Sequence, residues 1–307
     1  MESKKINVGG QAVIEGVLIR GPSKYVIAVR KKAKIMSKKG KIRKKSAIYK
    51  LPFIRGFVNL AEMMVLGTKA LMWSADQQLE KDEKIGKKEM AFSFIFAILF
   101  GAGIFIALPY IVTNLIGFYE ETKPLLFNLI DGVIRISFFL LYIVAISLMK
   151  DVKIMFQYHG AEHKAIHCYE KGKKLSVANV KKFTTLHPRC GTAFIIIVLV
   201  VAILIFSVLT PVILMIFPKL LSIHAFPRRL ILILIRFSLF PLIAGISYEF
   251  LKFSAKYESK PIMKIFIWPG LLMQKITTQE PNNRQIEVAI YSLKKLLAIE
   301  NKTHENL

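Results

Sequence analysis

Cysteine and acidic residues are scarce in this chain. Two Cys among 307 residues exclude a small scaffold held together by disulfides. No long apolar run opens the chain, so we expect no cleavable signal peptide. The 20 Asp and Glu are outnumbered by 45 Lys and Arg, for a net charge of +25, yet 54% of the residues are hydrophobic. Such apolarity excludes a largely disordered chain, and its combination with such basicity predicts an integral membrane protein with basic water-facing parts.

Charged residues are absent or rare in long stretches between residues 90 and 250. Four of them reach the roughly 20 residues that a transmembrane helix needs, namely 90–119, 125–149, 190–218 and 230–248. The second carries only Asp131 and Arg135, and the fourth only Arg236. The alternative, a soluble protein with buried helices, fits poorly with uninterrupted runs of this length. We therefore expect a mainly α-helical membrane protein with four transmembrane helices.

The distribution of Lys and Arg predicts the orientation. Residues 1–89 hold 21 of them, the segment 150–189 holds nine, and the tail from 251 holds nine. The short loop 120–124 holds only Lys123. By the positive-inside rule, both termini and the segment 150–189 face the cytoplasm, as in a multi-pass protein of a bacterial inner membrane.

The water-facing parts divide the chain further. We expect a basic, β-rich cytoplasmic region at 1–55, and an interfacial helix with a linker at 56–89. The transmembrane region then covers 90–250, and interfacial and amphipathic helices occupy 251–307. Within the first region, the weak alternation over 25–49 predicts a β-hairpin or small sheet with its turn at 37–40. The cytoplasmic part is thus a small α+β unit.

The N-terminal region also suggests a partner. Residues 23–50 carry 12 Lys and Arg, and no acid lies between Glu15 and Glu62. Beside a membrane, such a segment favours anionic lipid headgroups, although it can equally be a solvated face that only enforces topology. No recognition helix or aromatic platform supports binding of nucleic acid.

Histidine and cysteine concentrate in one segment. Four of the six His and both Cys fall between residues 150 and 192. On a helix, His159, His163 and His167 recur on one face, and two imidazoles at this spacing can hold one metal ion, zinc above all. The pattern His159-x-x-Glu162-His163 also fits the inverted zinc-protease motif, in which the glutamate is a general base.

A second part of this cluster is His187-Pro188-Arg189-Cys190. A reduced Cys190 beside Arg189, with a helix expected to begin just after it, favours the thiolate, which can bind metal or act as nucleophile. The candidate metal ligands are therefore His159, His163, and His187 or Cys190, with Glu162, Arg189 and Cys190 as candidate catalytic residues. A purely structural or lipid-contacting role for the cluster stays open, and Cys168 fits a buried apolar position better than a ligand.

Several motifs resemble the YqhQ-like family of bacterial membrane proteins. They are Gly9-Gly10-Gln11-Ala12-Val13-Ile14-Glu15-Gly16-Val17 with Arg20-Gly21-Pro22, His159-Gly160-Ala161-Glu162-His163-Lys164, His187-Pro188-Arg189-Cys190-Gly191-Thr192, and Pro269-Gly270-Leu271 with Gln274 and Thr277-Thr278. The resemblance covers nearly the whole chain in the right order. It implies a domain of unknown function labelled a predicted metal-dependent enzyme. It also implies that Glu15, Glu162, His163, His187, Arg189 and Cys190 lie in family motifs, whereas His167 and Cys168 lie outside them.

Three functions compete on these grounds. The first is a membrane-embedded metalloenzyme, a zinc hydrolase acting on a lipid headgroup or a membrane-protein segment at the cytoplasmic face. The second is a non-catalytic adaptor or regulator that binds anionic lipid or a cytoplasmic partner, with the cluster as a structural metal site. The third, a small transporter, is weakest, because no polar pathway crosses the midplane.

Charged residues inside the expected spans suggest one tertiary contact. Asp131 and Arg135 are spaced i, i+4 and can pair on one helix face. The second and fourth spans both start outside, so Arg236 lies at a similar depth. We expect Asp131 to pair with Arg135, with Arg236, or with both.

Reporter fusions test the predicted topology. A reporter fused after Glu120 should read as external, and one fused after Lys174 as cytoplasmic, because excess Lys and Arg retain a loop in the cytoplasm. Alkaline phosphatase activity and fluorescence of a fused fluorescent protein measure the two sides. The reverse pattern, or equal readings at both positions, would contradict the arrangement.

Overall fold

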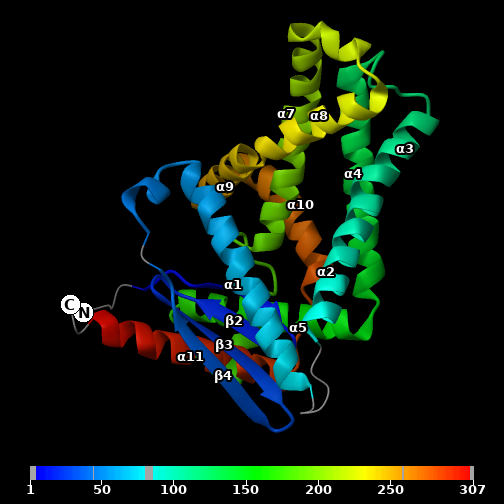
Figure 1. Cartoon of the computed structure of the whole chain (residues 1–307). Coiled ribbons are helices and arrows are strands. Elements are labelled where there is room, and N and C mark those ends of the chain that lie inside the picture. Colours follow the sequence, from blue (N-terminus) through cyan, green and yellow to red (C-terminus); the bar gives the residue numbers. More distant parts are fainter. Residues whose placement is uncertain (1–4, 44, 80–85, 258, 305–307) are drawn as a thin grey trace.

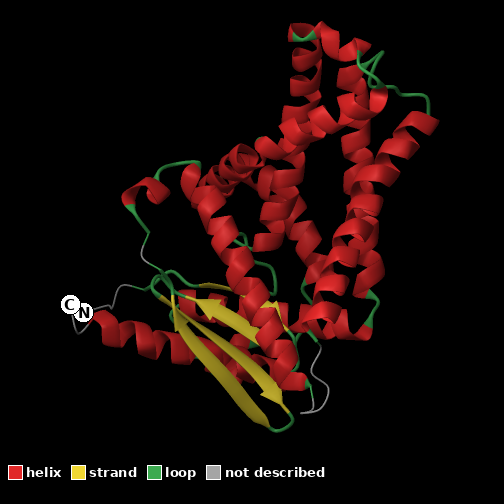
Figure 2. Ribbon diagram, viewed as in Figure 1, coloured by secondary structure: helices red, strands yellow, loops and turns green. Residues whose placement is uncertain are grey.

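The computed structural model describes residues 5–43, 45–79, 86–257 and 259–304. The protein has two halves (Figures 1 and 2): a four-stranded sheet flanked by helices, and a bundle of long helices that extends away from it. The strands are β1 (Gly9–Val13), β2 (Gly16–Arg20), β3 (Lys24–Lys31) and β4 (Lys34–Lys41). They form an antiparallel sheet in the order β1-β2-β3-β4, so β1 and β4 are its edges.

The predicted position of the hairpin turn is wrong. The chain reverses at residues 32–33, where Lys32 has a φ of 54°, and residues 37–40 lie inside β4. Gly40 lies opposite Tyr25, and a Cβ atom there would come within 2.3 Å of the Tyr25 side chain. The glycine therefore allows the tyrosine ring to cross the strand and does not form a turn.

Helices cover both faces of the sheet and form its two cores. On one face, α5 (Lys150–Glu170) and α11 (Asn283–His304) pack against Val17, Ile19, Val26 and Ala28. On the other face, α1 (Ile54–Gln78) packs through Ala70 against the alternate residues Val13, Leu18, Ile27 and Val29. Successive side chains of a strand point to opposite faces of the sheet, so neighbouring residues pack in different cores. The helices predicted at 56–75 and 285–299 correspond to α1 and α11.

Three helical segments in the described part of the chain are long and apolar enough to cross a membrane. They are residues 91–115, formed by α2 (Lys87–Ala102), a π-turn (Gly103–Ala107) and α3 (Leu108–Leu115), then α4 (Pro124–Ser147) and α7 (Gly191–Ile216). The fourth expected span is a pair of helices bent by 41°, α8 (Ala225–Ser238) and α9 (Phe240–Lys256). Pro241 in the first turn of α9 explains the break, because proline has no N–H with which to continue the hydrogen-bond ladder of α8. These apolar helices are compatible with a membrane protein.

The remaining helices are short connections or return the chain to the sheet. Short turns lie at Ala47–Lys50, at Pro218–Ser222, and in α6 (Val177–Val180). The helix α10 (Pro261–Thr277) runs from the end of α9 back towards α5 (Figure 1). It packs closely on α7, because a Cβ atom on Gly270 would lie 2.5 Å from that of Ala193. This glycine lets α10 approach the first turn of α7.

The charged residues of the candidate spans are only partly arranged as expected. Asp131 and Arg135 form the predicted ion pair, with 2.6 Å between Nε and Oδ2. Of the alternatives, only this pair is present: no hydrogen bond or ion pair joins Asp131 to Arg236 among the described residues. The Arg236 guanidinium instead donates to three acceptors at 2.9–3.0 Å, from Glu120, Asn128 and Thr210. Arg236 thus ties α8 to α4, α7 and the loop before α4.

Replacing Arg236 should destabilise the helical half. Arg236→Gln leaves the buried Glu120 carboxylate without its cation, so we expect a loss of roughly 3 kcal/mol in unfolding free energy. Lys123→Gln, at an exposed position in the same loop, is the control and should have almost no effect. Thermal unfolding of the detergent-purified protein measures both, and equal melting temperatures would show that the Arg236 contacts contribute nothing.

Candidate functional site

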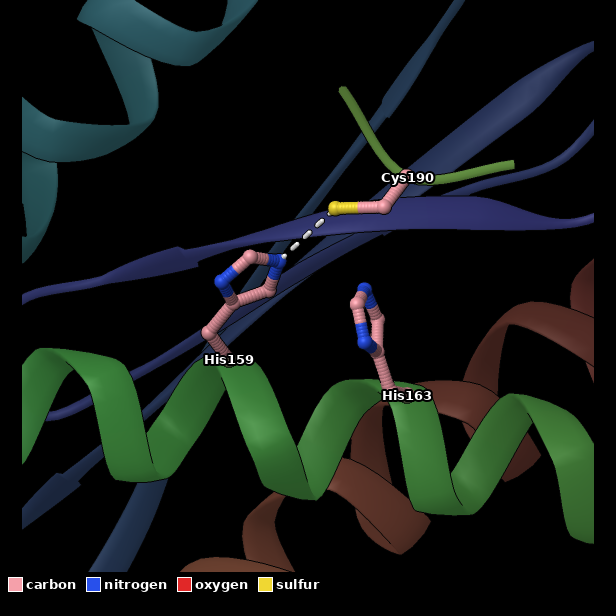
Figure 3. Close-up of side chains that lie close together, drawn as sticks. All are labelled: His159, His163 and Cys190. Carbon is pink, nitrogen blue, oxygen red and sulfur yellow. Dashed lines mark hydrogen bonds between the residues drawn. The ribbon is translucent and has the colours of Figure 1, made fainter. Parts of the chain in front are cut away.

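Two histidines and one cysteine meet where the sheet half joins the helical bundle. His159 and His163 lie one turn apart on α5, and Cys190 lies immediately before α7 (Figure 3). The Sγ atom of Cys190 is 3.2 Å from Nε2 of His159, and it also contacts His163. One potential ligand atom from each residue lies within 4.8 Å of the other two. We call this set the His159 group.

Backbone carbonyls determine which imidazole nitrogens face the group. His159 Nδ1 lies 2.8 Å from the carbonyl oxygen of Thr277, and His163 Nδ1 is bonded to that of Thr185. Because a carbonyl only accepts, each Nδ1 carries the hydrogen, and each neutral ring keeps its lone pair on Nε2. Burial lowers the pKa of both imidazoles, which favours this neutral form. Both rings are therefore prepared to bind a cation through Nε2.

Cys190 is held by the first turn of α7. It is the N-cap residue, and its sulfur accepts a hydrogen bond from the Thr192 N–H at 3.4 Å and lies 3.1 Å from Thr192 Oγ1. The expected helix start is therefore confirmed, and the sulfur lies at the N-terminal end of α7. The Arg189 guanidinium, in contrast, bonds to Glu170.

Glu162 lies beside this group in a polar cavity. The cavity has a volume of about 110 Å³ and is lined by Glu162, His163, His187, Arg189 and Cys190, with β1 on one side. The Glu162 side chain is 3% exposed, and burial raises its pKa to about 7. Its Oε2 lies 3.5 Å from His163 Nε2, and no hydrogen bond to Glu162 occurs among the described residues. A carboxyl group that exchanges a proton near neutral pH is suited to acid–base chemistry.

The other predicted residues form a second group one turn further along α5. His167, Glu170 and His187 place potential ligand atoms within 4.8 Å of one another. His187 accepts the Arg189 N–H through Nδ1 at 3.2 Å and donates through Nε2 to Glu170 at 3.3 Å. Although burial opposes its ionisation, the His187 hydrogen bond and the Arg189 charge hold the pKa of Glu170 below its usual value. Both nitrogens of His187 are therefore used within the protein.

Gln274, whose role the sequence did not reveal, fixes the loop that carries His187 and Cys190. This fully buried side chain donates to the His187 carbonyl at 2.9 Å and accepts the His187 N–H at 2.7 Å. Glu170 was also missed, although its position three residues after His167 is a usable signal. Of the remaining candidates, Cys168 lies outside both groups, buried against the Lys173 and Lys174 carbonyls. Glu15 accepts a hydrogen bond from Tyr158 at 3.1 Å.

This sequence is similar to those of known proteins. Residues 51–299 match the family described as a protein of unknown function, DUF1385. The chain is 32% identical to the uncharacterized protein YqhQ of Bacillus subtilis strain 168, over 97% of this chain and 94% of that protein. The resemblance to YqhQ-like proteins is thus confirmed. No solved structure matches this chain.

The double hydrogen bond of Gln274 makes a testable prediction. Gln274→Leu leaves the N–H and C=O of His187 buried without partners, so we expect a loss of about 2 kcal/mol in unfolding free energy. Lys275→Leu, at an exposed position on the same helix, is the matched control. Urea unfolding measures both variants, and equal stabilities would contradict a positioning role for Gln274.

Proposed function

The chain belongs to the DUF1385 family of YqhQ-like proteins, and we propose that it is a membrane-embedded, zinc-dependent hydrolase whose centre is the His159 group. One observation carries the proposal: two imidazole nitrogens and a thiol converge, and backbone carbonyls hold both rings with Nε2 directed inward. Such outer hydrogen bonds are typical of histidines that bind metal.

The donor set fits zinc. Two neutral imidazoles and a cysteine sulfur are the ligand types that zinc prefers, and three protein ligands leave one position for water or substrate. We choose Cys190 over His187 as third ligand, since His187 already uses both ring nitrogens. The Nε2 atom of His159 and the Sγ atom of Cys190 lie 3.2 Å apart, so both residues would be able to hold the ion.

Glu162 supplies the acid–base chemistry in this proposal. A zinc ion at the His159 group would supply a Lewis acid that polarises a scissile carbonyl group and lowers the pKa of water. Glu162 would take the proton of the attacking water and pass it to the leaving group. Arg189, whose side chain is 45% exposed at the rim of the cavity, would hold a polar group of the substrate.

The proposal includes a location at the cytoplasmic face of a bacterial inner membrane. The three candidate spans and the bent pair α8–α9 would form four spans, with both termini in the cytoplasm. The His159 group lies at the sheet end of α7, which then faces the cytoplasm. The exposed lysines of β4 would contact anionic headgroups there; they are Lys34, Lys38, Lys39 and Lys41.

The exposed lysines of β4 also favour the second candidate function. An adaptor would use β4 to bind anionic lipid or an acidic cytoplasmic partner, and the His159 group would be a structural metal site. The two functions differ at Glu162, because a structural site needs ligands but no general base.

Metal analysis of variants tests the proposal. His159→Ala, His163→Ala and Cys190→Ser should each lose most of the bound zinc, because each removes one of three ligands. His187→Ala should keep most of it, and His224→Ala, remote from the site, is the control. Glu162→Gln should keep zinc and lose hydrolysis by at least about a hundredfold, the usual contribution of a general base.

Mass spectrometry measures metal per chain. Release of amines from casein, or of headgroups from lipid vesicles, measures hydrolysis. Unchanged zinc in His163→Ala and Cys190→Ser would refute the metal centre. Activity that persists in Glu162→Gln would leave the structural metal site as the better account.

A further inference from the structure

The strand beside the site has an open edge. Gly21 N–H bonds to Lys24 O, and Arg30 N–H to Glu15 O, which fixes the odd-numbered residues of β2 as those facing β3. The even-numbered residues of β2 therefore bond to Gly9, Gln11 and Val13 of β1. By the same alternation, the N–H groups of even-numbered residues in β1 point away from the sheet.

Side chains accept hydrogen bonds from the outward N–H groups at the two ends of this edge, but not between the ends. The Ile6 N–H donates to the Tyr169 hydroxyl at 3.0 Å, and the Ile14 N–H donates to Ser74 Oγ at 3.1 Å. Between them, no residue in the described part of the chain accepts the N–H groups of Val8, Gly10 and Ala12. Val8 and Gly10 line the cavity of Glu162. Residues 8–12 thus offer an unpaired length of roughly 16 Å at the candidate centre.

Two glycines at this cavity have no role in packing. A Cβ atom on Gly9 or Gly191 would meet nothing within 4 Å, and neither residue has a positive φ. Both line the cavity, one from β1 and one from the first turn of α7. Glycine at these two positions leaves room for the close approach of another molecule. Gly10 differs, because a Cβ atom there would lie 2.9 Å from Glu162 Oε1.

The buried Glu162 provides an independent sign of an occupant. Its side chain is 3% exposed and lines the cavity, and no hydrogen bond to its carboxyl group occurs within the described residues. A buried carboxyl group normally has such a partner, so one from solvent or substrate is expected.

Resting on the proposed function, we infer that the substrate is an extended polypeptide segment that adds to β1 as a further strand. Its carbonyl groups would accept the N–H groups of Val8, Gly10 and Ala12, and its backbone would pass over Gly9 and Gly191. This pairing brings one peptide bond between Glu162 and Cys190. Addition of a strand to a sheet edge needs only main-chain groups, so it suits a polypeptide of varied sequence.

Lipid is disfavoured as the substrate. The cavity at the site is lined mainly by polar groups, and no large apolar groove adjoins it in the described part of the chain. The large apolar cavity of the protein, about 710 Å³, lies at the other end of α7, lined by Leu209, Ile213 and Phe217. Leu209 is 19 residues from Cys190, which is about 28 Å along the helix.

The reaction then balances as amide hydrolysis. Water oxygen forms a bond to the peptide carbon, and the C–N bond breaks. Glu162 takes a proton from the water and gives it to the leaving nitrogen. The products are a carboxylic acid and an amine, which become a carboxylate and an ammonium group after proton exchange, and no oxidant or reductant is needed.

A matched pair of variants at Ala12 tests the inference. Ala12→Pro removes an outward N–H without touching the ladder to β2, and proline is tolerated at such an edge position. Ala12→Val keeps that N–H and adds similar volume. The probes are fluorescently labelled β-casein, an unfolded polypeptide, and vesicles of phosphatidylethanolamine and phosphatidylglycerol, both given to the full-length, zinc-loaded protein.

We expect release of amines from casein and no release of headgroups from vesicles. The kcat/KM for casein should fall about tenfold in Ala12→Pro, the equivalent of one hydrogen bond, and stay within about twofold in Ala12→Val. Zinc content should match the wild type in both, and the two variants should have similar melting temperatures because both add volume beside the same core. In Glu162→Gln, casein should slow hydrogen exchange at the amides of Val8, Gly10 and Ala12.

Other outcomes would contradict strand addition, the hydrolase, or both. Equal cleavage by the two Ala12 variants would overturn strand addition while leaving the hydrolase intact. Release of headgroups with casein uncut would make the substrate a lipid, again with the hydrolase intact. If no zinc binds or neither probe is cut, the proposed hydrolase fails. Hydrogen exchange then decides whether a polypeptide docks on β1. If casein does not slow exchange at the amides of Val8, Gly10 and Ala12, the inference of strand addition fails as well.

Discussion

The hydrogen bonds from His159 and His163 to backbone carbonyls are the constraint on which the site depends. Each bond fixes a ring, its tautomer and the direction of its Nε2 lone pair. The accepting carbonyls belong to Thr277, at the end of α10, and Thr185, in the loop before α7. The His159 group is therefore formed only when these two segments have docked on α5. Without them, the same helix would carry two freely rotating imidazoles.

Close backbone approach makes this docking possible. A Cβ atom on Gly160 would lie 2.1 Å from the Gln279 carbonyl oxygen, so only glycine lets the chain after α10 run against α5. That chain is joined to α5 by the bond from Gln279 N–H to the Phe156 carbonyl, at 3.0 Å. The motifs that resemble the YqhQ-like family therefore meet in space: Gly10 lies on Glu162, Gly160 on the chain after α10, and Gln274 on the loop of His187 and Cys190.

The two polar centres of the molecule lie along one helix. Cys190 begins α7 at the sheet half, and Thr210 of the same helix accepts from Arg236 near the opposite end. The apolar residues between them make α7 the longest unbroken candidate span in the described chain. Such a helix separates a group of histidine, cysteine and glutamate, suited to metal chemistry, from a structural set of charges. The catalytic proposal and the stability of the bundle can thus be tested by variants that do not share a contact.

Much of the architecture follows from the sequence by itself. Long uncharged runs predict the candidate spans, because a helix in lipid needs continuous apolar length. The i, i+4 spacing of His159 and His163 predicts that both face one way, since this is the geometry of any helix. The helix start after Cys190 and the pair Asp131–Arg135 follow from equally local rules. Local rules fail where a residue is required by a neighbour that is distant in sequence. Gly40 leaves room for the ring of Tyr25, and the turn predicted at 37–40 was therefore wrong.

Only the tertiary structure decided which residues share a site. Choosing between Cys190 and His187 required the contacts of Glu170 and Arg189, which occupy both nitrogens of His187. The role of Gln274 depends on a pairing across 87 positions of the chain. Arg236 likewise bonds to Asn128 and not to Asp131, which lies one turn further along the same face of α4, because packing between helices sets the height at which the guanidinium meets that face. Spacing along a chain fixes which residues share a face, but packing between elements fixes what that face touches.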